Sequence, residues 1–175
     1  MKWAPLLLTG LLLASASAWT RTGTGAFAQE VTEVRISKFS GKQVPRFETL
    51  KYASVNGRKG PGRDHPILWH YERKGLPLLI IKESRDWRRV RDPDGAEVWV
   101  HARMLEPTDT AMVQADVTLH REPGAESEEI ARVEAGVLVQ LEDCSPDWCR
   151  IKAGNYRGWV PLRTLWGTDT GEASL

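Results

Sequence analysis

The sequence predicts an all-β protein made of two copies of one small module. Residues 75–105 and 136–165 repeat the same order of features: a glycine, an apolar run, a polar turn, Asp-Trp, a basic and apolar run, a second turn and Trp-Val. Each copy holds five or six short strand-like runs in about 55 residues, without an amphipathic helix. Such a pattern implies a small β-barrel or a partly open sandwich.

The strands of the first module can be placed one by one. Alternating or β-branched runs predict strands at 52–56, 67–72, 76–84, 87–91 and 96–100, and a single helical turn at 102–105. Residues 57–66 hold three Gly and two Pro and therefore predict a loop. Asp-Pro-Asp-Gly at 92–95 predicts a type I turn. The second module repeats these parts at offsets that change only in loops.

The expected organisation of the chain follows from these parts. Residues 29–46 show no sustained periodicity and predict a flexible arm. The first module then covers 47–107, the second covers 112–167, and 168–175 form a tail.

The high tryptophan content predicts what fills the cores of the two modules. The chain has eight Trp and three Phe. A domain this small has little core, and each Trp can bury on the order of 200 Å2. We therefore expect the four repeated residues to fill the cores: Trp87, Trp99, Trp148 and Trp159. Trp69 and Trp166 lie outside the strict repeat and are the better candidates for function.

The first 28 residues have the features of a signal peptide. Lys2 is followed by an apolar run at 4–14 that is too short to span a bilayer. Cleavage patterns end at Ala18 and at Ala28, and Ala28 is favoured because a polar start follows it; an uncleaved anchor is the alternative. We expect a periplasmic or secreted protein, in an oxidising compartment, with no stable membrane span after signal removal.

Several motifs resemble the bacterial SH3-type (SH3b) domains of exported proteins. The first module carries Val-Asn-x-Arg-x-Gly-Pro-Gly at 55–62, Asp-Trp-Arg-Arg-Val at 86–90 and Val-Trp-Val at 98–100. The second carries Glu-Pro-Gly at 122–124, Asp-Trp-Cys-Arg-Ile at 147–151 and Gly-Trp-Val-Pro at 158–161. The resemblance implies two SH3-like β-barrels in tandem and a binding role, in cell-wall targeting or protein contact, usually without catalysis. Gly57 departs from the pattern, since an apolar residue is common there, and we expect the first strand to be shortened at that point.

The two cysteines are expected to form a disulfide. If Pro146-Asp147 is a two-residue hairpin loop, Cys144 and Cys149 face each other in a non-hydrogen-bonded pair, where side chains lie closest. Two Cys without a nearby His fall short of a zinc site, and the spacing is not the redox Cys-x-x-Cys. The equivalent residues of the first module are Glu83 and Arg88, for which we expect an exposed ion pair.

The sequence contains no recognisable catalytic motif. None of the four His lies in metal-ligand spacing with another His or Cys, and Gly-x-Ser-x-Gly is absent. Residues 58–63 are basic and Gly-rich but lack the Lys-Ser/Thr ending of a P-loop. Asp92, Asp94 and Glu97 are expected to be solvated turn residues. We therefore predict a non-enzyme without cofactor or metal.

The two modules differ in net charge. Residues 50–105 hold 12 basic and 7 acidic residues, whereas 113–167 hold 6 and 9, so the balances are +5 and −3. Ordinary solvated surface, attraction between the modules, and an anionic partner of the basic loop are all compatible with this contrast. The net charge of +1 gives no case for nucleic-acid binding. The predicted ligand site lies beside the first loop and comprises Arg58, Arg63, Trp69 and Tyr71.

The leading hypothesis is a non-enzymatic, exported binding protein of the cell envelope. Its expected ligand is peptidoglycan or an envelope protein. The alternative is a structural or scaffold protein with no separate ligand, and a cell-wall hydrolase is the least favoured function.

Overall fold

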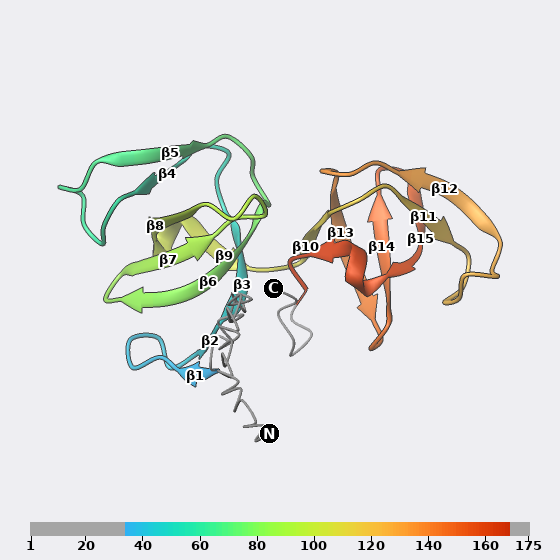
Figure 1. Cartoon of the computed structure of the whole chain (residues 1–175), viewed down its shortest axis with the longest axis horizontal. Helices are drawn as coiled ribbons and strands as arrows, with labels where there is room; N and C mark the ends of the chain where they lie inside the picture. Colours follow the sequence, from blue (N-terminus) through green and yellow to red (C-terminus); the bar gives the residue numbers. More distant parts are fainter. Residues whose placement is uncertain (1–33, 169–175) are drawn as a thin grey trace, which may run out of the picture. The chain divides into compact units, whose positions relative to one another are not determined.

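The computed structural model describes residues 34–168, which are coloured in Figure 1. The predicted signal peptide and cleavage sites, residues 29–33 of the predicted arm and residues 169–175 of the tail lie outside the described residues. Within residues 34–168, no helix is long and apolar enough to cross a membrane.

The first module is a seven-stranded antiparallel sheet. Its strands lie in the order β5-β4-β8-β7-β6-β3-β9 (Figure 1). They are β3 (Arg46–Leu50), β4 (Val55–Arg58), β5 (Ile67–Tyr71), β6 (Pro77–Ser84), β7 (Trp87–Arg91), β8 (Glu97–His101) and β9 (Leu105–Pro107). The predicted helical turn is the 3-10 helix η1 (Ala102–Met104).

The second module repeats this sheet strand for strand. Its order is β12-β11-β15-β14-β13-β10-β16. The elements are β10 (Thr110–Val113), β11 (Val117–His120), β12 (Glu129–Val133), β13 (Leu138–Cys144), β14 (Trp148–Ala153), β15 (Tyr156–Pro161), η2 (Leu162–Thr164) and β16 (Leu165–Trp166). The prediction of an all-β chain built from two copies is therefore confirmed. In the described part of the chain, no strand pairing joins the two ends of either sheet, so hydrogen bonds do not close them into barrels.

The first strand of the module differs from its prediction. A strand was expected at 52–56 and is found at Val55–Arg58, running through Gly57. A Cβ atom at position 57 would lie 2.5 Å from Val98 Cγ2, so glycine lets β4 pass close to β8. The expected shortening does not occur, because β4 and β11 have four residues each.

Both cores are aliphatic. The fully buried positions of the first core include Leu50, Leu78, Ile80, Val90 and Val100, and those of the second include Leu119, Ile151 and Val160. The four repeated Trp are only half-buried and belong to neither core, so the expectation that they fill the cores is wrong. Strand alternation is the reason: Val98 and Val100 point into the core, and Trp99 between them points outward.

The described part of the predicted arm forms a hairpin. Strand β1 (Arg35–Ile36) pairs antiparallel with β2 (Gln43–Val44). The hydroxyl groups of Ser37 and Ser40 donate to the Glu83 carboxylate on β6, over 2.5 and 2.9 Å. These hydrogen bonds attach the hairpin to the sheet, which a search for periodicity could not predict.

Glu83 and Arg88 face each other across β6 and β7, as their spacing predicts. Arg88 Nε lies 3.2 Å from Glu83 Oε1, and Arg46 approaches the same oxygen to 2.7 Å. Contrary to expectation, both residues are buried. Burial alone would raise the pKa of Glu83, but hydrogen bonds from Ser37, Ser40 and Arg46 and the charge of Arg88 hold that pKa below its usual range.

Side chains from both modules meet at their junction. Trp166 Nε1 donates to the carbonyl of Pro77 over 3.0 Å, and its ring meets Phe47 edge-on at 5.1 Å. Thr110 Oγ1 donates to the carbonyl of Gly75 over 2.7 Å. The contacts of Trp166 are therefore structural ones between the two halves of the chain.

Candidate ligand-binding face of the first module

Tyr71, one of the four predicted site residues, is buried. Its hydroxyl donates to Asp92 Oδ2 over 3.2 Å. Burial, then the charge of Asp92, raises the pKa of Tyr71 well above its usual value. Asp92 also accepts the backbone N–H groups of Asp94 and Ala96, so it is a buried turn residue and not the solvated one expected. Tyr71 thus ties β5 to the β7–β8 turn.

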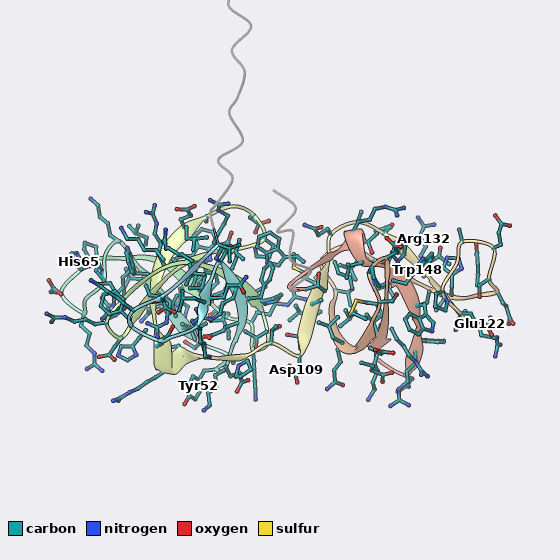
Figure 2. All side chains as sticks on the ribbon, turned by 90° about the horizontal axis from the view of Figure 1, so that it is seen from below. Tyr52, His65, Asp109, Glu122, Arg132 and Trp148 are labelled. Carbon is teal, nitrogen blue, oxygen red and sulfur yellow. A yellow bond between two sulfur atoms is a disulfide. The ribbon has the colours of Figure 1, made fainter. Side chains whose placement is uncertain are left out.

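Arg58 organises the loop between β4 and β5. Its Nη1 donates to the carbonyl of His65 over 2.7 Å, and Lys59 N donates to the carbonyl of Pro66. A Cβ at position 60 would lie 2.6 Å from the His65 ring, so Gly60 allows that ring to fold onto the loop backbone. Figure 2 labels His65 in this loop. Arg58 therefore positions the loop that carries Arg63.

Trp69 belongs to an apolar edge strand. Among the strands of residues 34–168, β5 pairs only with β4, and it exposes Ile67, Leu68 and Trp69 at 50, 55 and 49%. Edge strands of natural proteins usually carry charges that prevent pairing with other chains. A contiguous exposed apolar run at a sheet edge is typical of an interaction surface.

The second module does not share this edge. In the register of the two hairpins, Ile67 corresponds to Glu129 and Trp69 to Ala131. The residue between them is Leu68 in β5 and Ile130 in β12, at the same bulge. Ile130 packs against the second core, whereas Leu68 is exposed.

A reciprocal exchange of side-chain size explains the difference. The first module has Gly57 against Val98, and the second has Leu119 in place of the glycine and Gly158 in place of the valine. A Cβ at position 158 would lie 3.2 Å from Ile130 Cδ1, so Ile130 uses space beside Gly158. Val98 occupies the equivalent space in the first module and leaves Leu68 outside.

Sequence reasoning missed a second part of the face, around Trp87 and His101. The two rings meet edge-on with centroids 5.2 Å apart, and His101 Nδ1 accepts the backbone N–H of Arg103. Burial, opposed by Asp86 and reinforced by the charges of nearby arginines that include Arg63, lowers the pKa of His101. Only its repetition as Asp-Trp marked Trp87 in the sequence.

A cross-strand row lies on the outer surface of the sheet, beside the pair of Trp87 and His101. Register places Arg58 between Ile67 and Trp99, and Trp99 beside Arg89. The equivalent row of the second module is Glu129, His120, Trp159 and Arg150. The tryptophan is common to both rows, and the basic and apolar neighbours on β4 and β5 are specific to the first.

The equivalent loop of the second module is acidic. Arg121 and Glu128 form a two-pronged ion pair, with N–O distances of 2.7 and 2.9 Å. Among residues 34–168, Glu122, Glu126 and Glu129 form no ion pair. Figure 2 labels Glu122 in this loop. An anionic ligand would be attracted to the loop of Arg63 and repelled by that of Glu122.

The predicted disulfide between Cys144 and Cys149 is present. The two residues are paired across β13 and β14 with Cα atoms 4.1 Å apart, and Ser145 N donates to the carbonyl of Trp148 to close the turn. The described residues contain no group of three His, Cys, Asp or Glu side chains that could hold a metal ion.

Comparison with known proteins gives one family. Residues 51–107 and 113–167 each match the model of the bacterial SH3 domain. The chain matches no curated protein sequence. Similar solved structures include NlpC2 and NlpC1 from Trichomonas vaginalis, both 17% identical, with TM-scores of 0.34 and 0.33. The matches cover 73% and 77% of this chain and 49% of each structure, so the chain spans about half their length.

Proposed function

The chain belongs to the bacterial SH3 domain family, and on that premise we propose that it is a non-catalytic binding protein of the cell envelope. Bacterial SH3 domains are binding modules, often linked to the cell wall, and are generally non-catalytic. In this proposal the outer face and edge of the first module bind the ligand. The second module takes no direct part in binding the ligand and has a structural role.

The contrast between the two modules carries the proposal. Both keep the outward Trp at equivalent positions, Trp99 and Trp159. Only the first surrounds its Trp with Arg58 and exposed apolar residues, where the second has His120 and Glu129. A purely structural role would not require the two surfaces to differ in this way.

The chemistry of the face favours a ligand with carboxylates and apolar groups. Guanidinium groups bind carboxylates through paired hydrogen bonds, and aromatic rings stack on apolar or cationic groups. Peptidoglycan offers carboxylates on its peptides, and an acidic envelope protein offers the same groups. These two ligands remain the proposal's alternatives.

Cosedimentation with purified cell-wall sacculi tests the first ligand. Arg63→Gln should weaken retention about three- to fivefold, the effect of losing one partly exposed ion pair. Arg132 is an exposed arginine of the second module, so Arg132→Gln is the matched control and should leave retention unchanged. Unchanged retention of Arg63→Gln would remove the basic loop from the site.

In-cell crosslinking followed by pull-down tests the second ligand. A partner that is enriched with the native chain and lost with Arg63→Gln would identify an envelope protein. If neither sacculi nor a partner is retained, the scaffold alternative takes the place of the proposal. Hydrolysis of cell wall on a zymogram would contradict the non-catalytic assignment.

A further inference from the structure

The N-terminal hairpin combines exposed apolar and basic side chains. Val34, Ile36 and Phe39 are exposed at 55, 69 and 45%. Arg35, Lys38 and Lys42 alternate with them, and residues 34–42 contain no acidic residue. A patch of large exposed apolar side chains is typical of a binding surface, and this patch also carries positive charge.

A groove of about 550 Å3 lies between this hairpin and β6. Arg35, Lys38 and Lys82 line it with cations, and Ile36, Phe39 and Val44 line it with apolar surface. Glu83 also reaches the groove, but both its oxygens are engaged by Ser37, Ser40, Arg46 and Arg88. The groove therefore presents positive charge beside apolar side chains.

Two of the groove cations, Lys38 and Lys82, are available to an outside partner, whereas Arg35 Nη2 donates to the carbonyl of Ile81 over 3.3 Å. Within residues 34–168, neither Lys38 nor Lys82 forms an ion pair, whereas Lys42 pairs with Glu48 at 3.1 Å. Lys38 Nζ lies 5.3 Å from the centre of the Phe39 ring, which keeps a charge and an apolar group together at the tip. The serine bonds to Glu83 hold the tip against the sheet.

We infer that this hairpin is a contact surface for an anionic lipid bilayer. Ile36 and Phe39 enter the boundary between headgroups and acyl chains, while Arg35, Lys38 and Lys82 meet lipid phosphates. A lipid surface fits better than a small soluble anion, because it satisfies the exposed apolar side chains and the cations together. Lys82 pairs with Arg89 across β6 and β7, so this surface adjoins one end of the outer face of the first module, whereas Ile36 and Phe39 lie on the hairpin.

Vesicle cosedimentation of the full chain tests the inference. The chain should sediment with phosphatidylcholine vesicles containing about a quarter phosphatidylglycerol, and not with phosphatidylcholine alone. Lys38→Gln and Lys82→Gln should each weaken binding about fivefold, and added salt should weaken it further. Phe39→Ser should weaken it about tenfold or more.

Tyr52→Ser provides a matched control. Tyr52 is 47% exposed and also lies beside a lysine, with Lys51 Nζ 5.9 Å from its ring centre, but it is outside the hairpin. This variant should bind vesicles like the native chain. Equal losses for Tyr52→Ser and Phe39→Ser would overturn the inference.

Three further outcomes would overturn it. They are no binding to anionic vesicles at low salt, unchanged binding after both lysine substitutions, and displacement by inorganic phosphate at constant ionic strength, which would indicate a soluble-anion site. Phe39→Ser should leave sacculus or partner binding intact, so failure here and failure of the proposed function can be told apart. The lysine variants keep the test decisive if Phe39→Ser unfolds.

Discussion

Exchanging Gly57 and Val98 for the leucine and glycine of the second module tests why Leu68 is exposed. Gly57→Leu alone places its first side-chain carbon 2.5 Å from Val98 Cγ2 in a buried site, and overpacking of this kind costs about 1–3 kcal/mol. Val98→Gly alone empties the same space and adds strand flexibility, which together cost about 3 kcal/mol.

The two costs should not add in the double variant. The new leucine fills the space that the valine leaves, as Leu119 does beside Gly158. We expect the double variant to be more stable than the sum of the single effects predicts, by about 2 kcal/mol. Leu68 should then pack inward as Ile130 does, and β5 should become more protected from hydrogen exchange.

Urea unfolding followed by circular dichroism gives the free energies, and hydrogen-exchange mass spectrometry assigns the change to the first module. If the loss of stability in the double variant equals the sum of the two single losses to within about 0.5 kcal/mol, the reasoning is refuted. The reverse exchange, Leu119→Gly with Gly158→Val, is the control. It should show less compensation, because a Cβ at position 158 also meets the backbone oxygen of His120 at 2.8 Å.

Three other predictions concern stability. Replacing Cys144 and Cys149 together by Ser should cost about 2 kcal/mol in urea unfolding, the chain-entropy value for so short a loop, and no loss would show the disulfide to be energetically neutral. The pKa of Glu83 is lowered on folding, so its contribution to the free energy of unfolding is present above the ordinary glutamate pKa of about 4.3 and is lost as the pH falls. In Glu83→Gln, the free energy of unfolding should therefore depend less on pH in this acid range. The pKa of Tyr71 is raised on folding, so stability should fall with rising pH above about 10. If Tyr71→Phe loses stability above pH 10 just as the native chain does, Tyr71 is not the cause of that loss.

The hairpins were predictable because short turns set strand register. The turn before Trp148 places Cys144 opposite Cys149, and its counterpart before Trp87 places Glu83 opposite Arg88. The burial of the second pair was not predictable. It depends on Ser37 and Ser40, which reach Glu83 from more than forty positions away in the chain.

The predicted ligand site stays a prediction, but the structure shows which of its residues are exposed. Sequence composition marked the basic loop and Trp69, and both lie at the surface. Tyr71 follows two residues later on the same strand face but is buried, because its ring packs in the first core while Asp92 of a distant turn accepts its hydroxyl. Trp87 and His101 come together only when β7 pairs with β8.

By itself, the sequence determined the repeat, the all-β class, the hairpin registers and the charge contrast between modules, since each of these depends on local order along the chain. Tertiary structure decided which face of each strand is buried, and therefore that the repeated Trp point outward. It also decided that Leu68 is exposed while Ile130 is packed. That outcome depends on side-chain volume shared between β4, β5 and β8, and no single stretch of sequence contains it.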